Sequence, residues 1–214
     1  MSGKAVVVDV VSDVICPWCF LGKRRLDRAI ALVPEVDVAI RWRPYFLDPT
    51  IPAEGMDRRT YMVRKFGEER LKTIHDPFNV AGLAEGVQYN FEKITRTPNT
   101  TDAHRVIRFA VGSGVQEQVV DNLFAAYWSE GRDIGDAETL VDVASKSGLS
   151  GKDVQKHLAS DNGKLEVAQE VAQAQSMGVQ GVPTFIFAQH FGISGAQSPE
   201  TLADGIRRAA GNQG

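Results

Sequence analysis

The first forty residues contain three hydrophobic patterns that follow one another closely. Residues 6–10 form a short β-branched run, Val-Val-Val-Asp-Val, which is typical of a buried strand. Residues 26–33 place apolar side chains at helical spacing, with basic residues on the other faces. Every second residue from Val36 to Trp42 is apolar, which predicts a second strand. Because crossovers are right-handed, the two strands should be parallel, and residues 5–43 are expected to form a βαβ unit.

The pattern becomes helical in the middle of the chain. Prolines break the segment after residue 43, and no convincing strand occurs between residues 57 and 178. Asp57, Asp136 and Ser150 stand where capping residues should begin helices. The segment at 73–100 holds several Pro and Gly residues and is expected to be about half loop. The predicted helices are Arg58–Lys72, Thr101–Val111, Gln116–Ser129, Ala137–Ser147, Lys152–Ala159 and Lys164–Met177.

Strand patterns return near the C-terminus. Residues 182–188 form an apolar run, and a short turn at Gln189-His190 leads to a second strand pattern at 191–195. The two segments together predict a β-hairpin. Ser198 is placed to cap a last helix with Pro199 at its first position. The chain therefore has the element order βαβ, then a helical block, then ββα, which indicates an α/β protein.

The two cysteines of the chain, Cys16 and Cys19, lie where the first strand passes into the first helix. Pro17 occupies the position typical of the first helical residue. Unpaired N–H groups and the positive end of the helix macrodipole are expected to face Cys16 and to favour its thiolate. Cys19 lies one turn inside the helix and should be the less accessible sulfur. This arrangement predicts a redox-active pair.

Three other roles for the cysteines fit the sequence less well. Buried core thiols are common, but this turn is an unusual place for them. A structural zinc site needs four ligands, and neither a second cysteine pair nor a regular histidine spacing is present. A structural disulfide closing so short a loop would remove little entropy from the unfolded chain. No metal is therefore expected.

Composition limits the partners. The 214 residues are 43% hydrophobic and 24% charged with a net charge of −3, as in ordinary globular proteins. No basic stripe predicts nucleic-acid binding, and no run approaches the ~20 apolar residues that span a bilayer. Asp9 and Asp13 interrupt the only early apolar run, so a cytoplasmic location is expected. Whether the chain is a monomer or a homodimer stays open.

Two separated motifs resemble the DsbA family of the thioredoxin superfamily. They are Cys16-Pro17-Trp18-Cys19 after the first strand and Gly181-Val182-Pro183-Thr184 before a later one. Three further segments resemble the FrnE-like branch of that family, namely Ser12-Asp13, Pro98-Asn99-Thr100 with His104-Arg105, and Glu130-Gly131-Arg132-Asp133-Ile134. The resemblance implies a thioredoxin fold with a mixed central sheet, formed by residues 1–56 and 179–214, and an all-helical insertion domain at 57–178.

The resemblance also implies a function and its residues. The family are thiol-disulfide oxidoreductases or isomerases, in which Cys16 would attack and Cys19 would resolve the mixed disulfide with a protein or small thiol substrate. Pro183 would follow a cis peptide bond and lie beside the cysteines, with the Val182 backbone turned toward an extended substrate. The further substrate-binding residues expected are Pro17, Trp18, Thr184, Asn99 and His104. No cofactor is implied beyond the cysteine pair.

Two alternatives remain open. The chain could be a glutathione-dependent enzyme similar to 2-hydroxychromene-2-carboxylate isomerase or kappa-class glutathione transferase, with Asn99, His104 and Arg105 near a small substrate and glutathione as co-substrate. It could also be a non-enzymatic, chaperone-like protein that binds extended peptides. Whether the protein exchanges disulfides or only binds peptides, apolar groups of the helical insertion should line a groove that faces Cys16. The candidates for this lining are Phe46, Phe78, Trp128 and Met177.

Overall fold

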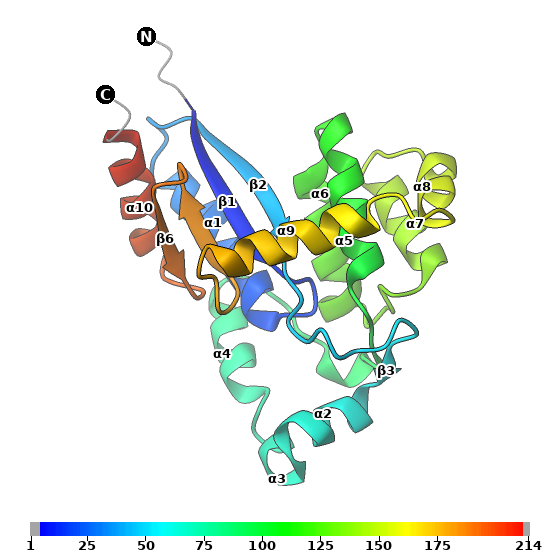
Figure 1. The fold of residues 1–214 in the computed structure, drawn as a ribbon. Helices are drawn as coiled ribbons and strands as arrows, with labels where there is room; N and C mark the ends of the chain where they lie inside the picture. The colour runs from blue at the N-terminus through cyan, green and yellow to red at the C-terminus, as the bar shows by residue number, and fades with distance from the viewer. Residues whose placement is uncertain (1–4, 212–214) are drawn as a thin grey trace.

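A four-stranded mixed sheet organises the computed structural model, which describes residues 5–211 (Figure 1). β1 (Val6–Ser12) is paired with the parallel β2 (Val38–Pro44) on one side and the antiparallel β5 (Thr184–Phe187) on the other. β6 (Phe191–Ser194) pairs with β5, which gives the strand order β2-β1-β5-β6. The predicted βαβ and ββα units are thus confirmed, together with the thioredoxin fold that carries a helical insertion.

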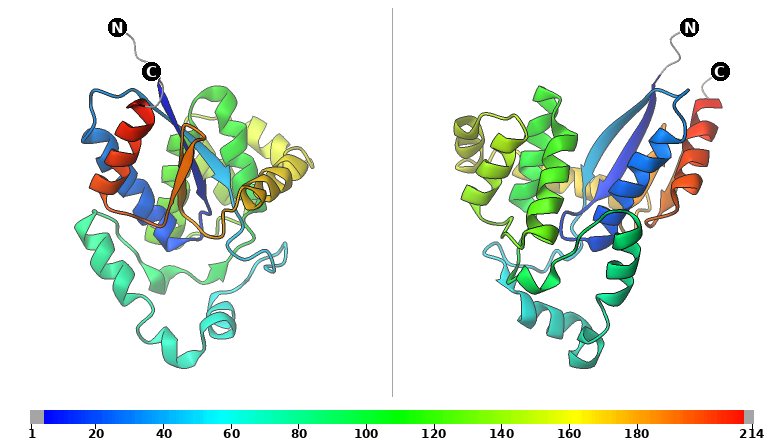
Figure 2. Two further views of the ribbon diagram at one scale, coloured as in Figure 1. Left: turned by 60° about the vertical axis from the view of Figure 1, so that its left-hand side comes forward. Right: turned by 180° about the vertical axis from the view of Figure 1, so that it is seen from behind.

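The helices α1 (Pro17–Ala31) and α10 (Pro199–Gly211) lie side by side on one face of the sheet (Figure 2). Glycines permit the close approach: a Cβ on Gly22 of α1 would lie 3.2 Å from the Phe185 ring, and one on Gly205 of α10 only 2.9 Å from the Phe187 ring. Both phenylalanines are fully buried. This face therefore contains the core of the thioredoxin-like part.

The opposite face of the sheet is covered by α9 (Lys164–Ser176), where Val11, Ala174 and Val179 form a small apolar cluster. α9 belongs to the helical bundle, residues 101–176, which also contains α5 (Thr101–Phe109), α6 (Gln116–Phe124), α7 (Ala137–Lys146) and α8 (Gly151–Leu158). A 3₁₀ turn, η2 (Ala110–Ser113), follows α5, and a π-helical segment, η3 (Ala125–Ser129), extends α6. The predicted helices of this region are confirmed to within a few residues at their ends.

Capping explains where several helices begin. The side chains of Asp57, Asp136 and Ser150 accept hydrogen bonds from backbone N–H groups three residues later, as predicted. The Ser198 hydroxyl likewise accepts from the Thr201 N–H at the start of α10. These starts follow from local chemistry, since each cap bonds to its own first turn.

Residues 56–97 form a separate part of the insertion, called the arm here, which reaches below the sheet (Figure 1). It contains β3 (Met56–Asp57), α2 (Arg58–Phe66), α3 (Glu68–Leu71), α4 (Asp76–Ala84), η1 (Phe91–Lys93) and β4 (Arg96–Thr97). β3 and β4 pair with each other and close the base of the arm.

The arm differs from the sequence prediction in three places. The single helix expected at 58–72 is interrupted at Gly67, which has a φ of 77°. No helix was predicted within residues 73–100, which were expected to be about half loop, but residues 76–84 form α4. Pro77 occupies the first turn of this helix, where its missing N–H removes no helical hydrogen bond. The β3–β4 pair was not predicted, because two-residue strands have no readable hydrophobic period.

A buried lysine joins the sheet layer to the bundle. Lys23 of α1 is 2% exposed, and its ammonium lies 2.6 Å from Asp27, 2.9 Å from Glu117 and 3.3 Å from Asp121. Two of these carboxylates belong to α6, so the charges fix the bundle against α1. No helix within residues 5–211 is long and apolar enough to cross a membrane.

Candidate active site

Cys16 occupies the N-cap position of α1, with Pro17 at the start of the helix. Its backbone is extended, at φ −93° and ψ 115°, and its carbonyl accepts the first N–H bond of the helix, from Cys19 at 3.0 Å. No helix N–H group makes a capping hydrogen bond to the Cys16 sulfur, and the stabilisation of its thiolate by the helix start stays a prediction. The sulfur lies instead 3.6 Å from the carbonyl oxygen of Val182, far away in the sequence.

Both cysteines are free thiols and almost fully buried, with 2% of Cys16 and 1% of Cys19 exposed. They differ in surroundings, because Cys16 lines an open cavity and Cys19 does not. Burial raises the pKa of Cys19 well above its usual value, and the adjacent Cys16 raises it further, against smaller opposing contacts from Ser12 and the Asp13 backbone. Cys19 is therefore held as a neutral thiol behind Cys16, which lines the cavity.

The segment Val182-Pro183-Thr184 lies beside the cysteine turn, and the Val182–Pro183 peptide bond is cis, as the resemblance implied. The Pro183 ring packs on α1 at Gly22, where an added Cβ would come within 2.9 Å of it. The Thr184 hydroxyl donates to the Gly181 carbonyl at 2.8 Å, which holds the preceding turn. The last residues before β5 thus stand against the first residues of α1.

Aromatic residues from the arm and the bundle hold the cysteine turn in place. The Tyr89 hydroxyl donates to the Pro17 carbonyl at 2.7 Å, and the Trp128 indole N–H donates to the Val14 carbonyl at 3.0 Å. Trp18 contacts Phe78, with ring centroids 4.6 Å apart. Tyr89 was not a candidate in the sequence, because nothing local connects it to residues 72 positions earlier.

Asp13 is a further residue whose position the sequence did not reveal. It is 1% exposed, and its carboxylate accepts from the Leu47 N–H at 2.7 Å. His104 is also buried; its Nε2 lies 3.5 Å from the Asp13 carboxylate and 3.1 Å from the Tyr45 carbonyl. Since a carbonyl only accepts, Nε2 carries a proton. The pair thus ties the cysteine turn to the loop after β2.

The cavity beside Cys16, called the Cys16 cavity, has a volume of about 600 Å³. It is lined by residues 15–18, Leu47, Trp128 and Val182, and by side chains of the arm between Arg58 and Thr97. Of the four apolar residues proposed for this lining, Phe78 and Trp128 are part of it. Phe46 and Met177 are not; Phe46 faces the His104 ring, and Met177 lines a separate hollow near β1.

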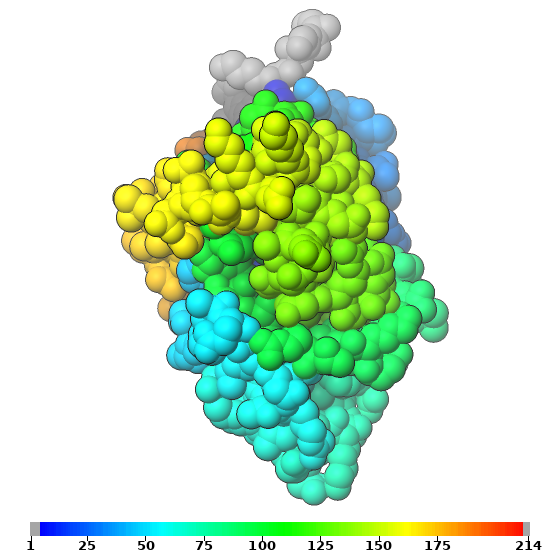
Figure 3. Space-filling model, turned by 90° about the vertical axis from the view of Figure 1, so that its right-hand side faces the viewer, coloured from blue at the N-terminus to red at the C-terminus, as the bar shows by residue number. Residues whose placement is uncertain are grey.

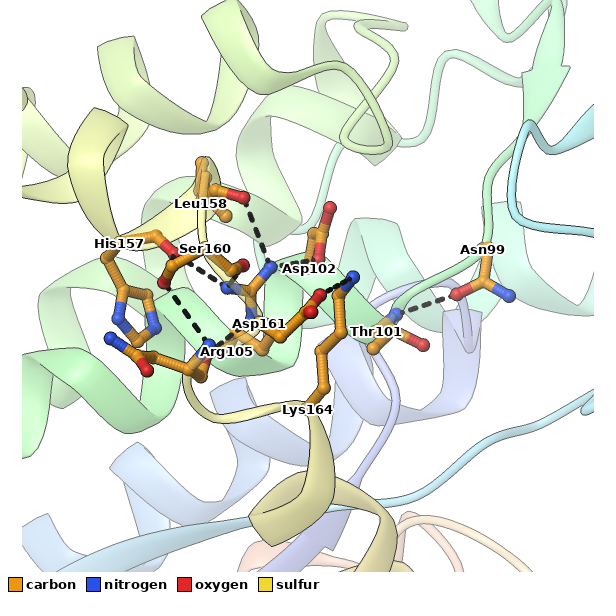
Figure 4. A network of polar contacts seen from close by, with 10 residues as sticks. Asn99, Thr101, Asp102, Arg105, His157, Leu158, Ser160, Asp161 and Lys164 are labelled. Atoms are coloured by element: carbon orange, nitrogen blue, oxygen red, sulfur yellow. Dashed lines mark hydrogen bonds and ion pairs between the residues drawn. The ribbon is translucent and has the colours of Figure 1, made fainter.

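Asn99, His104 and Arg105 do not line the Cys16 cavity, which corrects the expectation that they lie near a small substrate. The Asn99 side chain donates to the Ile51 carbonyl at 2.9 Å. It also accepts from the Thr101 N–H at 3.0 Å (Figure 4). His104 faces a different cavity of about 630 Å³, between β2 and the bundle. Arg105 is fully buried and donates to the carbonyls of His157, Ser160 and Asn162 (Figure 4).

Across residues 5–211, no group of three or more His, Cys, Asp or Glu side chains is arranged to hold a metal ion. The chemistry offered at the Cys16 cavity is that of two thiols, one at the cavity wall and the second behind it.

Comparisons with known proteins agree with this geometry. Residues 7–207 match the family model of the DSBA-like thioredoxin domain. The uncharacterized protein YwbO of Bacillus subtilis is 27% identical over 204 residues, which cover 94% of this chain and 96% of that protein. The crystal structure of the probable DsbA oxidoreductase SCO1869 from Streptomyces coelicolor is 30% identical, with a TM-score of 0.88 over 96% of this chain and 90% of that one. A 2-hydroxychromene-2-carboxylate isomerase shares the fold at 17% identity, with a TM-score of 0.71 over 97% of each chain.

Proposed function

Since this chain belongs to the family of DSBA-like thioredoxin domains, we propose that it exchanges disulfides with its substrates through Cys16 and Cys19. The observation that carries the proposal is the position of the two thiols. Cys16 lines the Cys16 cavity with its sulfur against the Val182 carbonyl, while Cys19 lies one helical turn away and is closed off from the cavity.

The reaction in the reducing direction has two steps. The Cys16 thiolate attacks one sulfur of a substrate disulfide, a mixed disulfide forms, and the other substrate sulfur leaves as a thiolate. Cys19 then loses its proton and attacks the Cys16 sulfur. The Cys16–Cys19 disulfide forms, and the second substrate thiolate leaves. The oxidising direction is the reverse.

The surroundings of Cys19 suit this order of events. Part of the rise in the pKa of Cys19 comes from Cys16, whose thiolate charge opposes a second negative charge beside it. That part disappears once Cys16 is bound in a mixed disulfide, while the Ser12 and Asp13 contacts that favour the Cys19 thiolate remain. Cys19 therefore becomes a better nucleophile at the stage when it must attack.

The proposal is tested by disulfide exchange with an oxidised protein such as insulin, reduced glutathione being the electron source. Cys16→Ser should lose at least ~100-fold in rate, since the attacking sulfur is gone. Cys19→Ala should accumulate mixed disulfides on Cys16 that dithiothreitol releases. Equal activity of the wild type and Cys16→Ser would exclude the proposed role. Assignment to the FrnE-like branch stays a prediction. A redox titration of the cysteine pair would help to decide whether the protein is an oxidase, a reductase or an isomerase.

A glutathione-dependent isomerase or transferase is a second candidate, favoured by the size of the Cys16 cavity. About 600 Å³ suits a small molecule. In such an enzyme Cys19 would be dispensable, so Cys19→Ala should retain full turnover with an aromatic substrate and glutathione. Absence of turnover in the wild type would leave disulfide exchange as the function.

A further inference from the structure

The lining of the Cys16 cavity is one-sided in charge. Arg58, Lys65 and Arg70 contribute to it, and none of the lining residues is an aspartate or a glutamate. The rest is mostly apolar or aromatic. The chain as a whole has a net charge of −3, so an excess of cations here is not a property of the entire molecule.

Two of these cations have no carboxylate partner. Within residues 5–211, no aspartate or glutamate forms an ion pair with Arg58 or Arg70, whereas the neighbouring Arg59 pairs with Glu68 at 2.9 Å. Arg58 makes only long hydrogen bonds, of 3.4 Å each, to the hydroxyls of Thr97 and Tyr127. The half-buried guanidinium also lies 5.9 Å from the centroid of the Trp128 ring. Since all of these partners are neutral, the charge of Arg58 favours an anion from a ligand.

A second, independent observation is an unsatisfied ring nitrogen. The Nε2 atom of His75 is buried and has no hydrogen-bond partner among the described residues, and His75 lines the same cavity. The ring is held parallel to Phe91 with centroids 3.9 Å apart. Burial and the nearby Arg58 lower the pKa of His75, so the ring is neutral near pH 7 and offers a hydrogen bond rather than a charge.

The remaining wall suits an aromatic body. Phe78, Phe91 and Trp128 line the cavity between these polar groups and Cys16. Their faces and edges are packed on one another, with centroid distances from Phe91 of 6.1 Å to Phe78 and 5.7 Å to Trp128. Such a wall binds flat apolar groups by contact area.

We propose that the Cys16 cavity takes a small aromatic thiol or disulfide that carries a carboxylate, with the carboxylate at Arg58 and Arg70 and the sulfur at Cys16. This inference rests on the proposed function and adds its substrate class. An extended protein chain fits less well, because its backbone is uncharged and only an acidic side chain or the C-terminal carboxylate could meet the guanidinium groups of Arg58 and Arg70.

The test uses two aromatic disulfides, dithiobis(nitrobenzoic acid), which carries a carboxylate on each ring, and its uncharged dimethyl ester. Cys16 attacks one sulfur and releases an aryl thiolate; Cys19 then closes the Cys16–Cys19 disulfide and releases the second. Each mole of protein thus releases two moles of coloured thiolate. The measured quantity is the ratio of the two rate constants, acid over ester, because any change in the reactivity of Cys16 itself affects both reagents alike.

Arg58→Gln and Arg70→Gln should each lower that ratio about threefold to tenfold, since each removes one charge that faces the carboxylate. Arg58→Lys should keep most of it. Arg59→Gln is the matched control. It removes the same charge from α2, the helix that carries Arg58, but Arg59 does not line the cavity. The inference would be overturned if the ratio stayed unchanged in both Arg58→Gln and Arg70→Gln. Because the Arg70 side chain is exposed, its replacement should leave the fold intact.

A non-reactive ligand gives a second readout. Naphthoate should slow the reaction of Cys16 with the uncharged ester, and naphthamide of the same shape should slow it much less. Equal protection by the two would show an apolar site without preference for an anion. Failure of the proposed function would look different: neither disulfide would react faster with this protein than with free cysteine.

Discussion

The arm and the helical bundle belong to the same insertion, yet different forces hold them. The bundle buries Leu123, Phe124, Tyr127 and Trp128 completely or nearly so. In the arm, α4 buries only Gly82, and Val80 and Leu83 are 75% and 84% exposed. Figure 3 shows the closely packed face of the bundle above the narrower arm. Elsewhere the arm does bury apolar residues, namely Tyr61, Met62, Val87, Tyr89 and Ile94, so the weakly buried part is α4, which supplies Phe78 to the wall of the Cys16 cavity.

The comparison has a functional meaning. The part of the wall that α4 supplies has few buried contacts and can adjust to a ligand at little cost, because local opening free energies follow the amount of buried surface. The cysteine turn itself is attached to both parts, through Tyr89 of the arm and Trp128 of the bundle. Substitutions in the bundle should therefore affect unfolding, and substitutions in the arm should affect reaction rates.

The largest expected effect on stability is that of Arg105→Met. The variant leaves the carbonyls of His157, Ser160 and Asn162 without their buried donor, which should lower the free energy of unfolding by ~3–5 kcal/mol. Urea unfolding measures it. Arg108→Gln, which loses an exposed pair with Glu170, is the control and should cost less than ~1 kcal/mol. The rate of exchange per folded molecule should not change in either; a slower Arg105→Met protein would connect the bundle to the chemistry.

Trp128→Phe should affect both properties. It removes the donor to the Val14 carbonyl and part of the cavity wall, so we expect a loss of ~1–3 kcal/mol in unfolding free energy and a slower reaction of Cys16. Urea unfolding and aryl disulfide kinetics measure the two effects. If only stability falls, Trp128 acts as a core residue and the cavity wall tolerates the change.

Tyr89→Phe removes only the hydroxyl that donates to the Pro17 carbonyl, at a cost of ~0.5–1.5 kcal/mol. Because that bond holds the cysteine turn, the attack rate of Cys16 should fall a few-fold. Tyr45→Phe is the matched control, since Tyr45 packs near Val11, does not line the Cys16 cavity, and its hydroxyl has no hydrogen-bond partner among the described residues. Equal rates for the two variants would mean that the Pro17 bond does not position Cys16.

The smallest expected effect is a dependence of stability on pH that comes from Asp48, whose carboxylate pairs with Lys65 of α2. Partial burial opposes ionisation of Asp48, but the Thr50 hydroxyl and N–H and the Lys65 ammonium together lower the pKa of Asp48 to about 2. A lowered pKa stabilises the folded state above the unfolded value of ~3.9, and that stabilisation is lost as the pH falls toward 2. Asp48→Asn should therefore be less stable than the wild type near pH 6, and the gap in thermal midpoints should close between pH ~4 and ~2. A gap that stays constant over this range would contradict the assignment.

Much of this structure could be predicted from short stretches of sequence. The strands at 6–12 and 38–44, the cysteine turn and the final ββα unit carry their own signals, because hydrophobic period, caps and turn residues act within a few positions. The same is true of the Cys16–Cys19 pair as a candidate site. The cis bond before Pro183 came from the family resemblance rather than from any local rule.

The tertiary structure decided everything that depends on distant partners. Asn99 and His104 carry chemistry that suits a site, yet Ile51, Tyr45 and Asp13 use their polar atoms and keep them out of the Cys16 cavity. Arg58 became a candidate only because the arm folds so that Arg58 and Cys16 line the same cavity. The sequence indicated Cys16 and Cys19 as the candidate redox pair and where most helices and strands begin. Which residues meet at the site depended on packing, because a contact between residues tens of positions apart leaves no local pattern.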